Sequence, residues 1–319
     1  MKLAAVIKNE QGFRVTGIYR ISRFELKRAK TGKRYGDCMI SDSSADIPAK
    51  CWDIEEEQAA VLTSHIILSV TGVLDFYKEA AQLTITDVAV PSDEERTAAL
   101  KELGLTSKRD RKDMADGLDR LIQSVRRDDL RRLLCYVFSS ADGFGDSFLR
   151  HPGAVWNHHA WIGGLAEHTL EVAELADTYC QRTTGISRDI LLTAALLHDI
   201  GKVQEIETDL LGLPLGFTAK GKLLRHIYLG MEQVEQACRQ VGASAETALI
   251  LKHCILSHHG QPEWGSPVEP MMMEAEILHY LDNISAKTDM FSRETERTAP
   301  GGFTRSQTLK RDIYRPEME

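Results

Sequence analysis

The sequence predicts a small β-barrel followed by a bundle of α-helices. The first ninety residues consist of short β-prone runs separated by turn formers, whereas apolar residues recur at helical spacing from Pro91 onward. The length of 319 residues is enough for about two domains, and 43% apolar with 27% charged residues is ordinary globular usage. A mostly disordered or fibrous chain is thereby excluded. The expected boundaries are 1–91 for the barrel, 92–150 for a helical connector, 151–291 for the helical bundle and 292–319 for a polar tail.

Six short runs are the predicted strands of the barrel. Several of them alternate apolar and polar residues, and turn formers such as Asn9–Gly12 and Ser41–Ser44 separate them. Five or six strands in this span, without long helices, favour an OB-like Greek-key barrel. The expected strands are Ala4–Ile7, Phe13–Ile21, Tyr35–Ile40, Asp46–Trp52, Ile66–Leu74 and Gln82–Val88.

The barrel carries a basic stretch that is compatible with nucleic-acid binding. Between Arg14 and Arg34 lie eight basic residues against one acidic residue, although the whole chain has a net charge of −8. The alternative is a solvated hairpin face, since positions 1–90 balance twelve basic against twelve acidic residues. Exposed aromatic side chains beside such a stretch would stack on bases. For Trp52 the alternative is a position in the core of the barrel. The residues expected to bind nucleic acid are Arg20, Arg23, Lys27, Arg28, Lys33, Tyr35 and Trp52, with Phe76 and Tyr77 as further stacking candidates.

The helical region begins directly after Pro91. Ser92 followed by Glu95 is a capping box, which predicts a helix N-terminus. Helices are predicted over 93–103, 109–124 and 128–139, and nearly continuous helix over 156–291. The segment from Ser292 is polar, contains Pro300-Gly301-Gly302, and is interpreted as a tail.

Three features indicate a soluble cytoplasmic protein without a membrane partner. The sequence has no apolar run of the roughly 18 residues that a membrane span needs. Asn9, Glu10 and Gln11 interrupt the N-terminus before the apolar core of a secretory signal could form. The six cysteines form no CxxC pair, which is typical of reduced thiols.

Histidines are concentrated in the helical region. Ten of the eleven lie between His151 and His279. His198-Asp199 ends a strongly apolar segment that must be buried, and Asp282 lies in another apolar helix. A buried carboxylate without a partner is very costly, and a metal ion is such a partner. Any one of these residues alone is better explained as a core histidine or a buried ion pair, but the set favours a metal centre.

The donor types indicate which metal. Histidine and carboxylate without thiolate suit Mn²⁺, with Fe²⁺ and Co²⁺ as alternatives and Mg²⁺ as a poorer match to imidazole. Two such ions bridged by one carboxylate, about 3.5–4 Å apart, would hold a hydroxide for in-line attack on phosphorus.

The same residues resemble the H…HD…D signature of the HD-domain metal-dependent phosphohydrolases, in the form of His168, His198-Asp199 and Asp282. His226 and His258-His259 match the additional histidines of members that hold two metals. Over most of its length the chain is similar to the YhaM-type 3′→5′ exoribonucleases, which join an N-terminal OB-fold to an HD domain. The segments that carry this resemblance are AKCWD (49–53), GGLAEHTLEVAELA (163–176), ALLHDIGKVQE (195–205) and, within 255–287, ILSHHGQPEWGSPVEP and EAEILHYLDNISAK.

The resemblance implies a role for each residue. A first metal ion would be held by His168, His198, Asp199 and Asp282. Asp199 would bridge to a second ion held by His226, His258 and His259, and Lys202 would neutralise the scissile phosphate. Neighbours on a regular helix diverge by about 100°, so His258 and His259 cannot both face one site unless a turn begins there, as Gly260 permits.

The remaining histidines are less specific. His253 is expected to be structural, and His65, His151 and His279 to be structural or at the surface. For His158-His159 the sequence leaves open a choice between substrate contact and orientation of a metal ligand.

The expected function is therefore a two-metal phosphodiesterase that trims single-stranded RNA, and single-stranded DNA as a second substrate, from the 3′ end. The direction of cleavage is implied by the resemblance alone, which also makes a homo-oligomer plausible. One alternative is an HD-type hydrolase of small nucleotides, although such a substrate needs no strand-binding barrel, and the GYP tripeptide of the cyclic-dinucleotide branch is absent. Another is a nucleic-acid-binding protein with a vestigial site, which the intact ligand set opposes.

Overall fold

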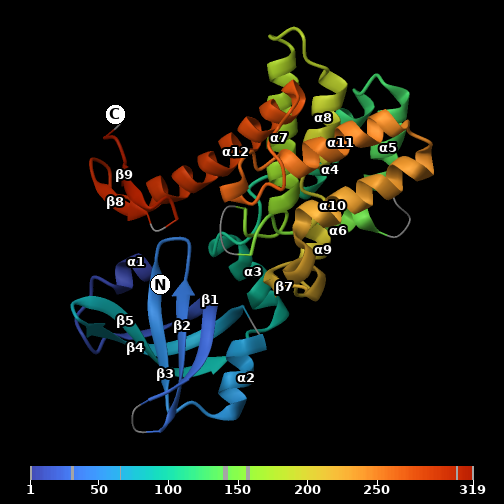
Figure 1. Ribbon diagram of the computed structural model, residues 1–319. Coiled ribbons are helices and arrows are strands. Elements are labelled where there is room, and N and C mark those ends of the chain that lie inside the picture. Colours follow the sequence, from blue (N-terminus) through green and yellow to red (C-terminus); the bar gives the residue numbers. More distant parts are fainter. Residues whose placement is uncertain are drawn as a thin grey trace. The chain divides into compact units, whose positions relative to one another are not determined.

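The computed structural model describes residues 2–29, 32–64, 66–138, 143–155, 159–306 and 308–317. The chain forms two compact units, Met1–Leu105 and Thr106–Glu319. The first contains a closed β-barrel and the second is mainly helical (Figure 1). The predicted fold class, an OB-like barrel followed by a helical bundle, is confirmed. No helix among the described residues is long and apolar enough to cross a membrane.

The barrel has the strand order β1-β2-β3-β5-β4, closed by pairing of β4 with β1. All neighbouring strands are antiparallel except β3 and β5, and α2 (Glu56–Ser64) connects β3 to β4. Alternate residues of each strand point into a core that includes Tyr19, Ile40 and Leu68. The strands are β1 (Arg14–Arg28), β2 (Arg34–Ser41), β3 (Asp46–Trp52), β4 (Ile67–Tyr77) and β5 (Ala80–Ala89).

The first predicted strand, Ala4–Ile7, is wrong: Leu3–Val6 forms the short helix α1. Its first backbone donors are taken by side chains of the β2–β3 turn. The Leu3 N–H donates to Asp42 Oδ2 at 2.8 Å, and the Ala4 N–H donates to Ser44 Oγ at 3.0 Å. These bonds satisfy the groups that a helix N-terminus leaves open, and both Leu3 and Val6 are buried in the barrel core. Tertiary contacts therefore override the strand propensity of this segment.

The helical unit shares one apolar core. Leu133, Leu170, Leu196, Leu251 and Leu278 come from five different helices and lie in the same buried cluster. The helices of the unit are α4 (Arg111–Gln123), α5 (Asp128–Phe138), α6 (Phe144–Arg150), α7 (Gly164–Cys180), α8 (Arg188–Leu197), α9 (Lys202–Glu205), α10 (Ala219–Val241), α11 (Ala245–Ser257) and α12 (Met273–Arg297). Two hairpins complete it, β6 (Ile206–Thr208) with β7 (Pro214–Phe217) and β8 (Phe303–Ser306) with β9 (Arg311–Tyr314).

The units divide the chain differently from the four predicted segments. The helix α3 (Asp93–Glu102), with the predicted capping box between Ser92 and Glu95, belongs to the barrel unit. The rest of the expected connector, α4 to α6, packs into the helical core because one face of each helix is apolar. The expected tail starts inside α12 and ends in the β8–β9 hairpin, where the Ser306 hydroxyl donates to Glu294 Oε1 at 2.7 Å.

Candidate metal centre and nucleic-acid face

Four side chains from three helices converge in the middle of the helical unit. His168 lies on α7, His198 and Asp199 follow the last turn of α8, and Asp282 lies on α12. His168 Nε2 is 3.2 Å from His198 Nε2, 3.1 Å from Asp282 Oδ1 and 3.5 Å from Asp199 Oδ2. His198 Nε2 is 3.4 Å from the same oxygen of Asp199. Two imidazole nitrogens and one oxygen of Asp199 therefore form one compact cluster, which Asp282 joins through its contact with His168.

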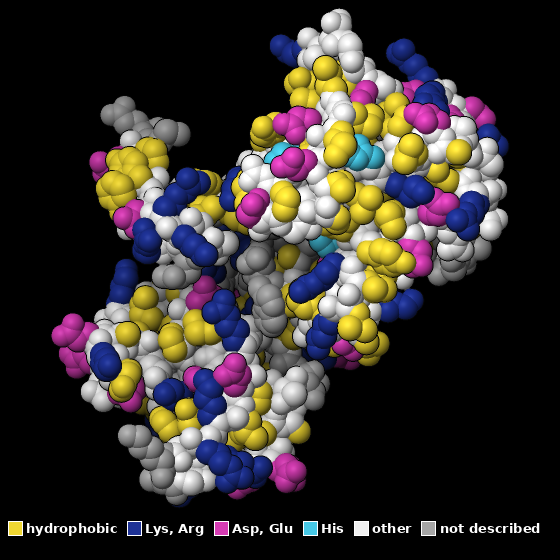
Figure 2. Space-filling view, in the orientation of Figure 1, with side chains coloured by type: hydrophobic (Ala, Val, Ile, Leu, Met, Phe, Trp, Pro, Cys, Tyr) yellow, Lys and Arg dark blue, Asp and Glu magenta, His cyan; other side chains and the backbone are white. Residues whose placement is uncertain are grey.

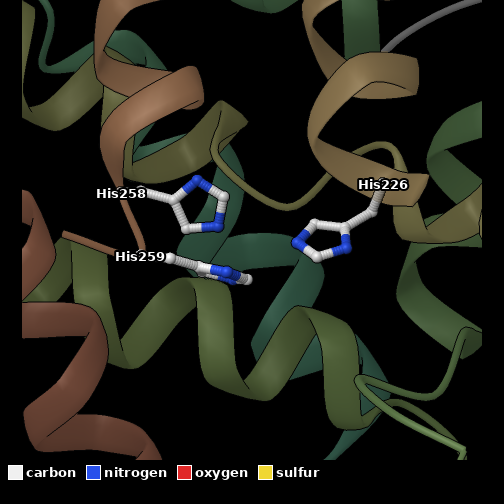
Figure 3. Close-up of side chains that lie close together, drawn as sticks. All are labelled: His226, His258 and His259. Atoms are coloured by element: carbon white, nitrogen blue, oxygen red, sulfur yellow. The ribbon is translucent and has the colours of Figure 1, made fainter. Parts of the chain in front are cut away.

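The other oxygen of Asp199 faces a second group of histidines. Asp199 Oδ1 is 3.6 Å from His226 Nε2 and 3.8 Å from His258 Nε2. The His226 ring is 5.2 Å from that of His259, and the His258 and His259 rings are 4.4 Å apart, centroid to centroid. Figure 3 shows the three rings directed toward a common space, His258 and His259 from the end of α11 and His226 from α10. Asp199 thus has one oxygen in each group.

Unpartnered atoms at this position fit a cation. Asp199 Oδ1, His226 Nε2 and His258 Nε2 are buried atoms without a hydrogen-bond partner in the described structure. A buried acceptor left without a partner costs on the order of 1–3 kcal/mol. Since all three can act as electron-pair donors and no thiolate is near, the residues present fit divalent cations that accept nitrogen and oxygen ligands.

Each histidine of the centre is anchored through its other ring nitrogen. The Nδ1 atoms of His198, His258 and His259 lie 2.7, 2.6 and 3.1 Å from the carbonyl oxygens of Ala195, Ile255 and Trp264. His226 Nδ1 is 3.1 Å from Glu205 Oε2, and His168 Nδ1 is 3.0 Å from the hydroxyl of Ser285. A carbonyl oxygen can only accept, so Nδ1–H donates and the Nε2 lone pair is left for a metal.

Electrostatics favour the ligand-competent protonation states of His258 and Asp199. Burial, together with the nearby rings of His259 and His198, holds the pKa of His258 well below its ordinary value. Burial opposes ionisation of Asp199, but Lys202 and His198 outweigh it and hold the pKa of this carboxyl well below its usual range. His258 is therefore neutral and Asp199 ionised near neutral pH, as metal ligation requires.

A sharp turn after α11 allows two adjacent histidines to face the centre. The helix ends at Ser257, and the Gly260 N–H donates to the Ser257 carbonyl at 2.8 Å. Gly260 has φ +80°, and a Cβ there would lie 2.5 Å from His279 Nδ1. The His279 ring in turn packs over this glycine, with Nδ1 3.0 Å from the carbonyl oxygen of His258. The turn that Gly260 permits is present, and both rings are brought in.

A break in α10 directs His226 toward Asp199. Arg225 has φ 65° and ψ 160°, a conformation that is nearly exclusive to glycine, and the helix resumes after it. Gly201 packs directly against this break, because a Cβ there would collide with the His226 carbonyl oxygen and lie 2.5 Å from the Gly230 nitrogen. The segment 198–202 (HDIGK) and the break in α10 therefore constrain each other's backbone position.

A cavity of about 470 Å³ opens beside the predicted metal ligands. Asp199, His259 and Asp282 line it, together with Lys202. Lys202 Nζ is 2.5 Å from Asp199 Oδ2. Burial disfavours its charge, but Asp199 outweighs burial and raises the pKa of Lys202, so its ammonium group stays protonated beside the ligands.

On the barrel, one row of the predicted nucleic-acid-binding residues comes together. Lys27 on β1 is opposite Tyr35 on β2, and Tyr35 is opposite Trp52 on β3, so the three side chains share one face. The Tyr35 and Trp52 rings are 4.9 Å apart, and 48% of Trp52 is exposed, which excludes the core-residue alternative. Lys50 Nζ lies 5.5 Å and 5.3 Å from the centroids of these rings and 6.0 Å from that of Tyr77.

The other predicted basic residues are spread along β1 and its hairpin. Lys33 pairs with Asp53 at 2.8 Å, and Lys27 itself contacts Asp37 at 2.6 Å. On the barrel face in Figure 2, dark blue basic side chains accordingly lie among both yellow apolar and magenta acidic ones. Arg23 (φ 54°) lies in a bulge of β1. Arg28 lies opposite Arg34 at the hairpin end of the strand pair, and Arg20 lies opposite Ser41 at its other end.

Known proteins match this arrangement. The HD domain family matches residues 165–287, which include every predicted metal ligand. The 3′-5′ exoribonuclease YhaM of Geobacillus sp. is 34% identical over 290 residues, 90% of this chain and 87% of that protein. YhaM of Bacillus subtilis is 33% identical over 290 residues (90% of both chains), and YhaM of Bacillus velezensis is 32% identical over 313 residues (98% of both). The chain belongs to the YhaM family.

The family resemblance predicted from the motifs is thus confirmed over nearly the whole chain. Among solved structures, the mitochondrial single-stranded DNA binding protein Rim1 of S. cerevisiae matches with a TM-score of 0.22 and 16% identity, covering 25% of this chain and 94% of that one.

Several contacts at the candidate sites of this YhaM family member were not predicted from the sequence. Glu205 and Ser285 anchor two histidines that are predicted metal ligands, and Lys50 joins the aromatic face of the barrel. Lys50 has a signal in the sequence, since it lies two residues before Trp52 on the same side of a strand. Glu205 and Ser285 have none that distinguishes them from other polar residues of helices.

The remaining histidines have structural surroundings where they are described. His253 Nε2 accepts the Met271 N–H at 2.9 Å, His279 supports the turn at Gly260, and burial lowers the pKa of His151 to about 4. His159 is 2% exposed, its ring centroid is 5.1 Å from that of His168, and its Nε2 is 3.7 Å from Glu171. His65 and His158 lie outside the described residues.

The anchor of His168 leads to a first testable prediction. Ser285 donates its hydroxyl proton to Glu171 Oε2 at 2.7 Å, so its oxygen accepts from His168 Nδ1–H. Ser285→Ala is expected to lower metal affinity roughly 10- to 100-fold, the usual cost of losing such a partner. Metal titration followed by calorimetry measures this, with Ser292→Ala on the same helix as the control. Equal affinities for the two variants would show that the anchor does not matter.

Proposed function

We propose that this protein is a metal-dependent 3′→5′ exoribonuclease that hydrolyses single-stranded RNA, and single-stranded DNA as a second substrate, with two divalent ions. The observation that carries the proposal is the carboxylate of Asp199, whose two oxygens face two separate groups of histidine nitrogens. The names of the YhaM relatives support the polymer and the direction. Mn²⁺ is proposed as the native ion.

The proposed ligand sets follow the two oxygens of Asp199. One ion would be held by His168, His198, Asp199 and Asp282, and the other by Asp199, His226, His258 and His259. Two divalent ions, when bound, lower the pKa of water to supply a nucleophile at neutral pH and stabilise charge on the phosphoryl oxygens.

The residues of the chain orient the substrate around this centre. Lys202 lines the same cavity as Asp199 and Asp282 and keeps its proton, so it can donate hydrogen bonds to a phosphate oxygen. Such a cation beside the reacting phosphate stabilises the charge that develops in the transition state. The Nδ1 anchors of the histidines hold the ligands in place before substrate arrives, which avoids reorganisation during the reaction.

The barrel favours a polymeric substrate over a small nucleotide. Tyr35 and Trp52 present two adjacent rings, with the Lys50 ammonium within 5.5 Å of both centroids. Stacking on aromatic rings next to a cation is the usual way in which single strands are bound without sequence preference. A hydrolase of free nucleotides has no need for such a face.

A time course with single-stranded RNA labelled at its 5′ end tests the proposal. In the presence of Mn²⁺ the label is expected in a ladder that shortens by one nucleotide at a time, and Asp199→Asn protein should leave the RNA intact. Release of the label as a mononucleotide would reverse the direction. If RNA stays intact and a panel of free nucleotides releases phosphate, the enzyme is a small-nucleotide hydrolase instead.

The aromatic face of the barrel leads to a second prediction. Trp52→Ala is expected to weaken RNA binding about 5- to 150-fold, since stacking of one base contributes about 1–3 kcal/mol. Fluorescence anisotropy of labelled RNA in the Asp199→Asn background measures this without cleavage. Tyr136→Ala, an equally exposed ring on α5, is the control. If Trp52→Ala and Tyr136→Ala weaken RNA binding equally, the aromatic face of the barrel is not part of the RNA-binding site.

A cytoplasmic location and a homo-oligomer, both expected from the sequence, stay predictions.

A further inference from the structure

One wall of the cavity beside the proposed metal ligands is aromatic and has no role in the proposed reaction. Trp264, from the 3₁₀ turn Pro262–Trp264, lines the same cavity as Asp199, Lys202 and Asp282. We infer that this cavity is a subsite for one nucleotide, in which Trp264 stacks on the base of the 3′-terminal residue. The inference rests on the proposed function and deepens it, because it names the residue that recognises the end of the strand.

Trp264 lies in the loop that follows His258 and His259. The backbone carbonyl oxygen of Trp264 accepts a hydrogen bond from His259 Nδ1 at 3.1 Å. The Trp264 N–H donates a hydrogen bond to the Gln261 carbonyl oxygen at 3.0 Å, which closes the backbone turn. Gly265, with φ 90°, ends this turn. The His279 ring packs near the indole, with centroids 5.6 Å apart. A platform fixed in this way loses little conformational freedom when a base binds.

The ring is nevertheless open to solvent. Trp264 is 54% exposed, although it lies in a concave site. A large apolar surface left exposed in a cavity is typical of ligand-binding sites, where aromatic walls combine with a few polar groups. Every base has a π-face, so stacking on indole accepts any of the four bases. That tolerance suits an enzyme that removes one residue after another.

The size and charge of the cavity fit one nucleotide. Its volume of about 470 Å³ falls in the range of small-molecule sites, about 300–1,000 Å³. Lys287 on α12 lines the cavity as well, and five residues of helix place its Cα about 7.5 Å along the axis from that of Asp282. The lining therefore contains two cationic side chains, Lys202 and Lys287, and an aromatic wall for an uncharged base.

Binding of mononucleotides tests the subsite independently of RNA cleavage. Calorimetric titration of the Mn²⁺-loaded protein with adenosine 5′-monophosphate and with ribose 5-phosphate compares ligands that differ only in the base. The nucleotide is expected to bind about 5- to 150-fold more tightly. Trp264→Ala should abolish this difference, and Trp264→Phe should keep most of it. Equal binding of both ligands by the wild-type protein, or an unchanged difference in Trp264→Ala, would overturn the inference.

Two controls separate a binding role from a structural one. The metal content of the Trp264 variants should equal that of the wild-type protein, since the hydrogen bond to His259 comes from the backbone carbonyl of Trp264, which every substitution keeps. If Trp264→Ala does not fold, tryptophan fluorescence still decides: quenching by the nucleotide should occur in the wild-type protein and be lost in Trp264→Phe. Quenching that persists in Trp264→Phe contradicts stacking on this ring.

An RNA with an abasic 3′-terminal residue then links the subsite to the reaction. Wild-type protein should remove the abasic residue more slowly than an ordinary one, and Trp264→Ala should remove both at the same reduced rate. Equal rates for both ends in the wild-type protein would contradict the inference but leave the exonuclease proposal intact. If RNA is not shortened at all while the base-dependent binding is present, the exonuclease proposal fails and the subsite belongs to a small-nucleotide enzyme.

Discussion

Asp199→Asn is expected to lower the rate of RNA hydrolysis by at least about 10³-fold and to remove most of the bound metal. Asp199 offers one oxygen to each histidine group, so this substitution affects both ion positions at once. Charge stabilisation by metal ions contributes several kcal/mol to a phosphoryl transfer, and about 1.4 kcal/mol is tenfold in rate. The rate on labelled RNA and the metal content by elemental analysis measure the two effects together.

The matched control is Asp116→Asn, which removes the same charge from an exposed position of α4. It should leave both the rate and the metal content at the wild-type level. RNA binding by the barrel should survive in both variants, since the aromatic face lies in the other unit. Asp199→Asn protein that keeps full activity would refute the assignment of the centre, and loss of metal without loss of activity would refute a metal-dependent reaction.

The clustering of the candidate metal ligands was predictable because their chemistry is unusual for where they lie. A carboxylate such as Asp199 at the end of a strongly apolar segment is costly in a core unless something pairs with it. All seven predicted ligands lie within the HD-domain match at 165–287, and the structure gathers six of them into two clusters of three, with Asp282 beside His168. The direction of cleavage, by contrast, has no trace in these residues and comes from the relatives.

The supporting contacts were not predictable because they depend on tertiary packing. Ser285 is an ordinary polar residue of α12 until α7 places His168 and Glu171 beside it. The break at Arg225 lies in a sequence that is predicted to be continuous helix, and the close packing of Gly201 against it is visible only in the tertiary structure. The short helix α1 likewise depends on Asp42, which is far away in the sequence.

Gly201→Ala is expected to destabilise the protein by about 1–3 kcal/mol, the usual cost of an overpacked core. Gly201 has φ −63° and ψ −18°, values that alanine adopts freely, so the effect is purely steric. The added Cβ meets backbone atoms of His226 and Gly230, which no side-chain rotation can relieve. The break in α10 must therefore move, and His226 moves with it.

The displacement of His226 should affect metal binding and RNA hydrolysis as well as the stability of the protein. A shift of about 1 Å in a positioned group can lower a rate about 10²-fold, and metal content should fall because His226 leaves Asp199. Gly117→Ala in α4 is the control: the nearest atom to its Cβ is Arg120 Nη2 at 3.6 Å, and alanine there should be neutral or stabilising. Thermal unfolding, metal analysis and RNA hydrolysis compare the two variants. Gly201→Ala protein that matches Gly117→Ala in all three would show that the HD segment and the break in α10 do not position each other.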